Sequence, residues 1–438
     1  MSYQSILPKF NITQLNEMQL SMIDAFNQQS DITLISPTGS GKTLAFFLPL
    51  VAKIEAATKG DILALIIVPT RELALQIEQV FKQMGTPHKI NCCYGGHSVR
   101  IEKNNLSQTP AVLVGTPGRI AYHVRENNIN LSKAQYLILD EFDKSLEAGF
   151  QEEMAFIIQQ MKKVKSRILT SATAIKEIPK FVGLKDPIML DFTQGVQQPL
   201  VGLEQFFVRV PGDDKLEALM LLIGQLQEKS AIVFCNHRDA VNRISDQLHK
   251  HKIIHGFYHG GLEQIDREKT LIKMRNGTTR LIITTDLASR GLDIPEIDVV
   301  VHYQLPLKED AMIHRNGRTA RMNANGEVYF LLDASDYLPE YLEEKPKEIT
   351  LPNDFKLPPA PKWKTLFIKA GKKDKINKMD IVGMLLQKGK LIKDDLGKIE
   401  VLDHSAYVAV NAAKLKQTLI LIKEEKLKGR KIRMEEAS

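Results

Sequence analysis

The residues DITLISPTGSGKTLAFFL, 31 to 48, decide the fold of the first part of the chain. An apolar run ends at Ile35, a loop with two glycines follows, and a helical pattern of apolar residues begins after Lys42. A strand, a glycine-rich loop and a helix in this order are the setting in which a phosphate loop occurs. The stretch therefore predicts an α/β domain that binds a nucleotide at the start of a helix, where free backbone N–H groups favour an anion.

The loop SPTGSGKT, residues 36–43, supplies groups that suit a triphosphate. Its glycines let the backbone approach phosphate closely, and Lys42 is expected to reach the β and γ phosphates. The Thr43 hydroxyl is expected to ligate Mg²⁺. The expected nucleotide contacts in this loop are Ser36, Thr38, Gly39, Ser40, Gly41, Lys42 and Thr43.

A second apolar run, YLILDEFDKSL at 136–146, ends in three acids: Asp140, Glu141 and Asp143. Adjacent carboxylates repel one another, so the cluster implies a cation, a basic partner or plain solvent. Parallel strands bring their carboxyl ends to one edge of a sheet, which would place these acids beside the phosphate loop. We then expect Asp140 to hold Mg²⁺ through water and Glu141 to polarise the attacking water. Without the loop, the cluster would indicate only a solvated strand end.

Short apolar runs alternate with helix-length segments along most of the chain. This βαβα rhythm predicts parallel sheets with helices on both faces. A polar joint at 193–202, with Gly, Pro and a Gln pair, separates two series of runs. We therefore expect two α/β domains, at 1–195 and 203–342. The expected strands are 31–36, 62–69, 111–115, 136–140 and 167–171 in the first domain, and 204–210, 231–236, 253–258, 280–286, 299–303 and 326–332 in the second.

The composition changes again at residues 343–363, where Pro and Lys are frequent and apolar periodicity is weak, so this segment is expected to be a linker. Beyond it, residues 364–438 fit the order β-α-β-β-α-β. This order predicts an RRM-like α+β sandwich, a common RNA-binding scaffold. The expected elements are strands at 365–370, 396–403, 405–411 and 430–435, and helices at 378–389 and 412–429.

The composition indicates a globular protein of several domains, because the 438 residues are 43% hydrophobic and 25% charged. No apolar run is long enough to span a bilayer, and the N-terminus shows no cleavable signal pattern. Cys92, Cys93 and Cys235 form neither a CxxC motif nor a Cys/His cluster, so we expect no structural metal and no disulfide framework. We expect buried thiols in a reducing cytoplasm instead.

The positive charge is concentrated at the end of the chain. Residues 361–438 contain 19 Lys/Arg and 10 Asp/Glu, whereas the rest of the chain contains 40 and 42. A basic segment on a nearly neutral body indicates an anionic partner, of which nucleic acid is the leading candidate. A solvated lysine-rich surface is the alternative that charge alone leaves open.

Further motifs follow in a set order, and that order resembles the DEAD-box RNA helicases of superfamily 2 over residues 8–333. DEFD at 140–143 stands where that family has DEAD. Each short motif by itself is weak, whereas the ordered set is specific. The other matching motifs are PTRELA (69–74), YGG (94–96), TPGR (116–119), SAT (171–173), HGGLEQIDRE (259–268), TTDLASRGLD (284–293) and HRNGRTAR (314–321).

The resemblance implies two RecA-like domains in tandem that bind ATP with Mg²⁺ and grip RNA. It implies that Gln19 reads adenine and Asp293 contacts the ribose. Ser171 and Thr173 would couple the nucleotide state to domain closure, and His314 would bridge the domains. Arg318 and Arg321 would be arginine fingers, which suit transition-state phosphate charge and make hydrolysis conditional on closure. The implied contacts to the RNA backbone are Thr70, Arg71, Gly96, Thr116 and Arg119 in the first domain, and Arg267 and Thr285 in the second.

The chain departs from the family pattern at four positions. Phe142 replaces the usual Ala of the acid motif and is expected to face apolar packing. Ala320 replaces the last Gly of the arginine motif, which would be strained if that position needs a positive φ. Ser36 replaces Ala conservatively. Ile12 stands where an aromatic residue is common, so adenine selectivity is expected to be weaker than usual.

The tail from about Lys364 resembles the RNA-binding domain of DbpA-type bacterial helicases, through LGKIEVLDHSAYVAV and GRKIRM. In that group the target is structured RNA of the large ribosomal subunit, so the tail would supply specificity and raise the local RNA concentration at the core. Tyr407 is a candidate contact, although a core position is favoured for it, and Trp363 is expected to dock the linker. The other candidate contacts are Lys372, Lys373, Lys375, Lys378, Lys388 and Lys390.

We therefore expect a cytoplasmic, monomeric, ATP-dependent RNA helicase. It would unwind short RNA duplexes locally and act on ribosomal RNA during large-subunit assembly. An ATP-gated RNA clamp or scaffold without productive unwinding is the alternative, and a DNA-directed motor of superfamily 2 is a weaker one.

Overall fold

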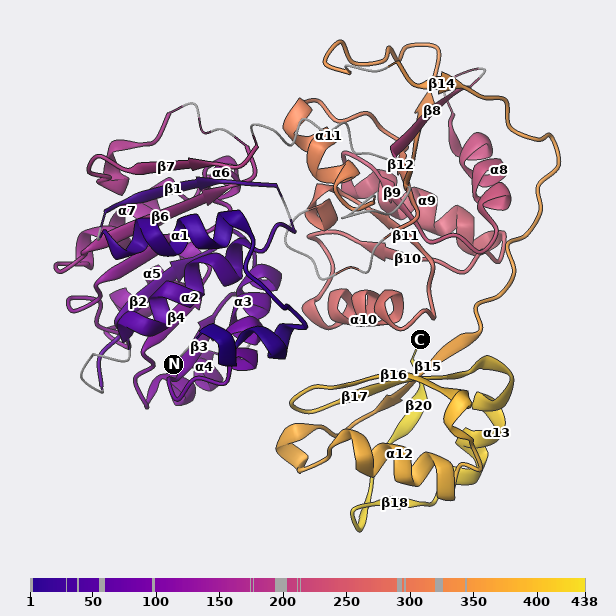
Figure 1. Cartoon of the computed structure of the whole chain (residues 1–438). Helices are drawn as coiled ribbons and strands as arrows, with labels where there is room; N and C mark the ends of the chain where they lie inside the picture. Colours follow the sequence, from indigo (N-terminus) through magenta and orange to yellow (C-terminus); the bar gives the residue numbers. More distant parts are fainter. Residues whose placement is uncertain are drawn as a thin grey trace. The chain divides into compact units, whose positions relative to one another are not determined.

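The computed structural model describes the chain except residues 1–2, 29, 38, 55–59, 97–98, 174, 176, 194–202, 211, 213, 290–293, 295–296, 320–325, 343–344 and 438. The chain divides into two compact units, Met1–Pro199 and Leu200–Ser438. Figure 1 traces both by sequence colour. Among the helices that the structure describes, none has the length and apolar character needed to cross a membrane.

The first unit contains a seven-stranded sheet in which all neighbouring strands are parallel, in the order β3-β4-β2-β5-β6-β1-β7. Two of its strands were not expected from the sequence, β3 and β7. Because all strands run in one direction, their carboxyl ends share one edge of the sheet. The strands are β1 (Ile32–Ile35), β2 (Ala64–Ile67), β3 (Ile90–Cys93), β4 (Val112–Gly115), β5 (Tyr136–Leu139), β6 (Ser166–Ser171) and β7 (Ile188–Asp191).

Helices cover both faces of this sheet, as expected for a parallel sheet. Alternate strand residues point to opposite faces, so Leu34 and Ile66 pack with α1, α2 and α3, whereas Leu65 and Leu137 pack with α5 and α7. The helices are α1 (Glu17–Asn27), α2 (Lys42–Ile54), α3 (Arg71–Met84), α4 (Val99–Leu106), α5 (Pro117–Arg125), α6 (Phe142–Glu147) and α7 (Gln151–Gln160).

The second unit begins with another seven-stranded parallel sheet, in the order β10-β11-β9-β12-β13-β8-β14. Helices α8 and α9 cover one face, and α10 and α11 cover the other. The strands are β8 (Leu203–Arg209), β9 (Ala231–Phe234), β10 (Gly256–Tyr258), β11 (Leu281–Thr284), β12 (Val299–His302), β13 (Gly326–Leu332) and β14 (Lys347–Glu348), and the helices are α8 (Leu216–Leu226), α9 (Arg238–Lys250), α10 (Gln264–Arg275) and α11 (Glu309–Asn316).

The segment expected to be a linker, 343–363, contributes to the second sheet. Strand β14 pairs with β8, and Ile349 and Leu351 pack against the core beneath α8 and α9. The chain then passes over α8, where a Cβ added at Gly224 would lie 2.8 Å from the backbone oxygen of Lys356. Much of this segment is therefore held against the second α/β domain rather than free in solution.

The C-terminal domain has the expected α+β order, built on an antiparallel sheet with the order β16-β17-β15-β20. Its second helix ends at Ile422 rather than at 429, and residues 426–431 form a small hairpin that the sequence analysis assigned to helix and strand. Lys428 and Gly429 make its turn with φ values of 50° and 76°. The elements are β15 (Trp363–Ile368), α12 (Lys378–Gln387), β16 (Leu396–Val401), β17 (Ala406–Asn411), α13 (Ala412–Ile422), β18 (Lys426–Leu427), β19 (Arg430–Lys431) and β20 (Met434–Glu436).

Candidate functional site

The phosphate loop joins β1 to α2 at the carboxyl edge of the first sheet. Lys42, the first residue of α2, donates from Nζ to the backbone oxygens of Ser36 (2.5 Å) and Pro37 (2.9 Å). The hydroxyls of Ser36 and Ser40 lie 2.7 Å apart. Gly41 has φ 93°, a left-handed backbone conformation that favours glycine, and a Cβ there would lie 2.8 Å from Nε2 of Gln19. The loop thus forms a compact turn whose lysine is satisfied by the loop's own carbonyls.

Gln19 lies under this loop and is almost completely buried. It forms a capping box with Asn16: its Oε1 accepts from the Asn16 backbone N–H, and Asn16 Oδ1 accepts from its backbone N–H. Asn16 also donates from Nδ2 to the backbone oxygen of Ser40. The residue expected to read adenine is therefore positioned by the start of α1 and by the phosphate loop together.

Asp140 and Glu141 follow β5, two strands away from β1. Asp140 is buried, and its Oδ1 accepts from the Glu141 backbone N–H (3.1 Å) and from the Thr170 hydroxyl at the end of β6. Glu141 has a left-handed backbone with φ 48°, an uncommon conformation for a residue with a side chain. Such conformations persist where surrounding contacts hold them, and here Thr170 also accepts from the Glu141 N–H at 3.3 Å.

At this edge of the sheet, the charges of the acids and of Lys42 affect one another's pKa. Burial raises the pKa of Asp140, whereas the Thr170 hydrogen bond and the charge of Lys42 lower it. Burial lowers the pKa of Lys42, and the charges of Asp140, Glu141 and Asp143 oppose that change. The cation and the acids therefore lie close enough to stabilise one another, as the sequence analysis expected of the two motifs.

The SAT segment, residues 171–173, begins at the end of β6 and is hydrogen-bonded to the phosphate loop. Ser171 Oγ donates to the Thr173 backbone oxygen at 2.6 Å, and the Ser36 N–H donates to the Ser171 backbone oxygen at 3.0 Å. Phe142 is fully buried among the apolar residues that pack with α5 and α7, as expected for this departure from the family pattern. The phosphate loop, the acids and the SAT segment thus form one connected group around β1, β5 and β6.

The residues expected to contact RNA follow the other three strands of the same edge. Thr70 precedes α3 and accepts from the Leu73 N–H at 3.2 Å. Arg71 lies against Gly96, because a Cβ at Gly96 would come within 2.1 Å of the Arg71 guanidinium. Thr116 donates its N–H to the Cys93 backbone oxygen at the start of α5. The strand order therefore separates a nucleotide half, β5-β6-β1, from a second half, β3-β4-β2.

Glu102 on α4 organises this second half, and the sequence analysis did not identify it. Its carboxylate is fully buried, lies 3.3 Å from Arg119 Nε and 2.7 Å from His123 Nε2, and accepts from the Tyr94 N–H at 3.0 Å. Arg119 Nε also donates to the Tyr94 backbone oxygen at 3.3 Å. One buried acid thus links the YGG and TPGR motifs.

Cys93, Glu102 and His123 offer ligand atoms within 4.8 Å of one another. Glu102 is already paired with Arg119, and burial together with the Glu102 charge raises the pKa of the Cys93 thiol. A thiol binds metal as the thiolate, so this cluster is better suited to an ion-pair role than to holding a cation.

The second unit carries its expected residues on the carboxyl side of its own sheet. Arg267 lies in the first turn of α10 after β10 and is 5% exposed, and Thr285 follows β11. His314 and Arg318 lie on and just after α11 and are mostly buried. Thr38, Asp293, Ala320 and Arg321 lie outside the described residues, so their expected roles stay predictions.

Arg315, which the sequence analysis passed over, belongs to the arginine motif and is fully buried. Its guanidinium donates to Asp286 Oδ1 (2.5 Å), the Gln304 backbone oxygen (2.7 Å) and Asn236 Oδ1 (2.7 Å). It therefore connects the strand ends of β9, β11 and β12 and fixes the base of α11. The motif itself held the signal, since a third arginine lies between His314 and Arg318.

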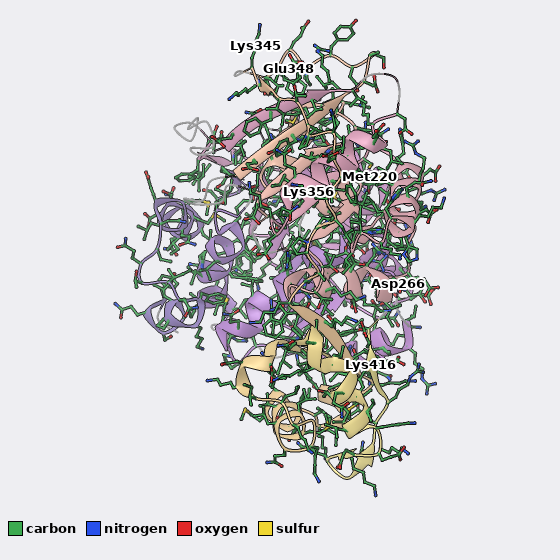
Figure 2. All side chains as sticks on the ribbon, turned by 90° about the vertical axis from the view of Figure 1, so that its right-hand side faces the viewer. Met220, Asp266, Lys345, Glu348, Lys356 and Lys416 are labelled. Carbon is green, nitrogen blue, oxygen red and sulfur yellow. The ribbon has the colours of Figure 1, made fainter. Side chains whose placement is uncertain are left out.

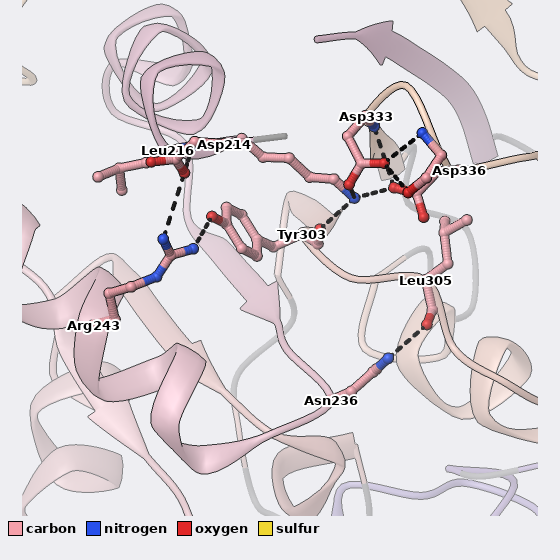
Figure 3. A network of polar contacts seen from close by, with 10 residues as sticks. Asp214, Leu216, Asn236, Arg243, Tyr303, Leu305, Asp333 and Asp336 are labelled. Carbon is pink, nitrogen blue, oxygen red and sulfur yellow. Dashed lines mark hydrogen bonds and ion pairs between the residues drawn. The ribbon is translucent and has the colours of Figure 1, made fainter. Parts of the chain in front are cut away.

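A second polar network holds the neighbouring strand ends (Figure 3). Lys215 Nζ lies 3.3 Å from Asp333 and pairs with Asp336. The guanidinium of Arg243 lies between Asp214 (3.7 Å) and the Tyr303 hydroxyl (2.9 Å). These charged and polar groups pair with one another and hold the segment after β13 against the start of α8. A structural role is therefore enough to explain this network.

His302, at the end of β12, is a buried neutral histidine. Its ring stacks on Phe330 with centroids 4.9 Å apart, and its Nε2 lies 2.9 Å from Asn316 Oδ1. Burial, and then the charge of Arg315, lowers its pKa from the ordinary 6.5 to about 3. The folded chain therefore keeps this ring neutral at pH values where an unfolded chain would protonate it.

This difference predicts a loss of stability in mild acid. The neutral ring favours folding above about pH 6.5, and that contribution falls as the pH falls because the unfolded state gains a proton that the folded state does not. Between pH 7 and pH 5 we expect the native chain to lose roughly 2 kcal/mol relative to His302→Gln. Urea unfolding of both proteins across this range is the measurement, and parallel pH curves would contradict it.

One edge of the first sheet carries the nucleotide motifs on β5-β6-β1 and a second set of motifs on β3-β4-β2, and a second RecA-like sheet follows in the chain. This arrangement defines a helicase of the two-domain class. Comparison with known families agrees. Residues 16–181 match the DEAD/DEAH box helicase family, residues 214–323 match the helicase conserved C-terminal domain, and residues 365–436 match the DbpA RNA binding domain.

The chain is 30% identical to the ATP-dependent RNA helicase DbpA of Escherichia coli (strain K12), with 98% of each chain covered. It is 29% identical to the ATP-dependent RNA helicase DbpA of Bacillus subtilis (strain 168), with 97% of this chain and 95% of that one covered. The chain therefore belongs to the DEAD-box ATP-dependent RNA helicases, and within them it is DbpA-like. The fold is similar to that of S. cerevisiae Dbp5 bound to RNA and ADP BeF3, at a TM-score of 0.68 and 24% identity over 76% of this chain and 88% of that one.

Proposed function

We propose that the protein uses ATP hydrolysis to open short RNA duplexes locally, and that it acts on ribosomal RNA during assembly of the large subunit. The observation that carries the proposal is the shared strand edge of the first unit. There the phosphate loop and acids occupy β5-β6-β1, and the RNA motifs occupy β3-β4-β2. Ligands on adjacent halves of one rigid edge can favour the same domain arrangement, so their binding is expected to be mutually reinforcing.

Lys42 has a defined part in nucleotide binding under this proposal. In the described state its ammonium group donates to two loop carbonyls. A triphosphate offers a charged acceptor in their place, and charge-assisted hydrogen bonds are stronger than bonds to neutral carbonyls. ATP binding would therefore release Lys42 from Ser36 and Pro37 and turn it toward phosphate.

The acids beside Lys42 fit a Mg²⁺ ion carried by the nucleotide. Both carboxylate oxygens of Asp143 are buried without a hydrogen-bond partner among the described residues, although Lys144 lies 3.3 Å away. Thr43 and Asp140 would hold the ion, the latter through water. When bound, the ion would neutralise phosphate charge. Glu141 would orient the attacking water from its fixed position at the start of α6.

The second domain would complete the hydrolytic site on closure, through Arg318 and Arg321. Phosphate contacts from the TPGR and PTRELA motifs would grip RNA without reading its sequence. A closed enzyme that bends one strand would release the other, which is local unwinding. Multiple-turnover strand separation tests this step, and ATP-dependent RNA retention without strand release would favour a clamp.

The choice of RNA is assigned to the C-terminal domain. We expect deletion of residues 364–438 to remove the enrichment of ribosomal RNA when the protein is crosslinked to total cellular RNA. ATPase activity stimulated by poly(A) should remain, because the phosphate contacts lie in the helicase domains, and this activity also reports that the truncated chain is folded. An unchanged crosslinked RNA set after deletion would contradict the proposed source of specificity.

A further inference from the structure

The sheet of the C-terminal domain has two different faces. Residues such as Leu366 and Val408 point toward α12 and α13 and form the core of the domain. The opposite face carries Thr365, Tyr407 and Ala409, which belong to adjacent positions of β15 and β17. No helix of the domain covers this face, yet these three residues are 1%, 3% and 0% exposed. Phe367 of the same sheet packs on Tyr407 with ring centroids 5.3 Å apart, whereas the Thr365 hydroxyl is contacted from outside the domain.

The covering element is the end of α10 with the turn that follows it. Arg275, the last residue of α10, makes a two-point ion pair with Glu400 of β16: Nε to Oε1 at 2.9 Å and a terminal nitrogen to Oε2 at 2.7 Å. Asn276 donates from Nδ2 to the Thr365 hydroxyl at 2.9 Å, and the Thr278 hydroxyl lies 2.7 Å from the same oxygen. Arg275 and the turn that follows it thus contact β16 and β15, the two strands that flank β17 in the sheet.

The shape and charge of the two surfaces agree with this contact. A Cβ added at Gly277 would lie 3.3 Å from Trp363, so the turn fits closely against that ring. Asp266 and Glu268 on α10 lie near enough to Tyr407 to help raise its pKa, after the larger effect of burial. Figure 2 labels Asp266 of α10 and, in the C-terminal domain, Lys416.

The chain between the two domains supports the same position. Phe355 lies against Gly224 on α8, and Pro358, Pro359 and Pro361 line a cavity of the second helicase domain. The apolar side chains of Ile223, Leu226 and Ile253 line the same cavity. Prolines restrict the chain before docking, so less conformational entropy is lost on holding it there.

We propose that the helix-free sheet face of the C-terminal domain is a docking surface for α10 and the turn at 276–278 of the same chain, and that it stays docked while RNA is bound. In RRM domains this face is the one on which RNA bases stack, so docking and stacking exclude each other here. The second helicase domain and the tail then move as one body. Since α10 also carries Arg267 at its other end, an RNA held by the tail has a set position relative to that residue.

A disulfide tests the docked position in the full chain. The hydroxyl oxygens of Thr278 and Thr365 lie 2.7 Å apart, so Thr278→Cys with Thr365→Cys places two thiols within bonding reach. We expect this pair to oxidise to near completion without RNA, and the matched pair Thr278→Cys with Lys388→Cys, on the far side of the sheet, to stay reduced. Single-cysteine variants control for the three native thiols. Equal yields from both pairs would overturn the docked position.

The same disulfide tests whether docking persists with RNA. ATPase stimulation by purified ribosomal RNA is titrated for the oxidised and the reduced pair. We expect the half-stimulating RNA concentration to differ by less than about twofold, because a permanently docked tail still binds RNA. A rise of tenfold or more on oxidation would overturn the proposal and assign the sheet face to RNA. The disulfide yield without RNA does not depend on which RNA the tail selects, so that measurement tests the docked position even if the ribosomal target is wrong.

A charge reversal provides an independent check. Arg275→Glu and Glu400→Arg each place like charges together, so each is expected to lower the rate of disulfide formation severalfold. The double variant restores opposite charges and should recover most of that rate. Failure of the double variant to recover, in proteins that keep poly(A)-stimulated ATPase, would overturn the pairing.

Discussion

Replacing Glu141 by glutamine is expected to lower RNA-stimulated ATP turnover by at least about 100-fold while ATP binding stays within a few-fold of the native chain. Glutamine keeps the size of the side chain but cannot accept a proton or orient water with a negative charge. The position should survive the change, because the backbone N–H of Glu141 is held by Asp140 and Thr170 rather than by its own carboxylate.

The measurement is steady-state ATPase with saturating RNA, together with equilibrium binding of a fluorescent ATP analogue. Glu152→Gln is the matched control, because Glu152 is an exposed glutamate of the same unit, in the first turn of α7. That control should leave turnover unchanged. Substantial RNA-stimulated hydrolysis by Glu141→Gln would remove this residue from the role of water-orienting group.

Replacing Glu102 by alanine is expected to destabilise the first unit by about 3–5 kcal/mol, the usual cost of breaking a buried ion pair by removing one partner. The alanine leaves His123 Nε2 and the Tyr94 N–H without the acceptor that they share in the buried interior. It also leaves Arg119, only 14% exposed, without its carboxylate. Urea unfolding of the full chain measures the loss.

Two comparisons separate stability from RNA binding. Glu78→Ala removes a partly exposed helical ion pair with Lys82 and should cost less than about 1 kcal/mol. Glu102→Gln can still accept from the Tyr94 N–H, so it should fold, but it no longer balances the charge of Arg119. We expect it to need a several-fold higher RNA concentration for half-maximal ATPase at unchanged maximal turnover. Native stability in Glu102→Ala would show that the cluster has little energetic weight.

The elements that were predicted well are those whose pattern is local. Strands such as Tyr136–Leu139 are continuous apolar runs between turn residues, and the phosphate loop has its glycines and lysine at set spacing. The strands Ile90–Cys93 and Ile188–Asp191 were missed because each is short and polar in part. Both lie at an edge of the sheet, so each pairs with one strand only. Their pairing partners, not their composition, make them strands.

The hairpin at 426–431 was missed for a different reason. Its residues continue the Lys-rich composition of α13, so periodicity favours a longer helix. In the structure α13 ends at Ile422, and the positive φ values at Lys428 and Gly429 make the turn of the hairpin. The Lys-Gly pair was the available signal, since a two-residue hairpin turn needs positive φ at both positions.

The chemistry could be predicted from residue order alone: which strand ends carry a phosphate loop, which carry acids, and which carry arginines. These features depend on neighbours along the chain, so local spacing reveals them. The folded chain was needed to show that Glu102 joins Tyr94, Arg119 and His123, and that Arg275 of α10 pairs with Glu400 in the sheet of the C-terminal domain. Those contacts join residues far apart in the chain, and their energy comes from burial and charge pairing that no local pattern encodes.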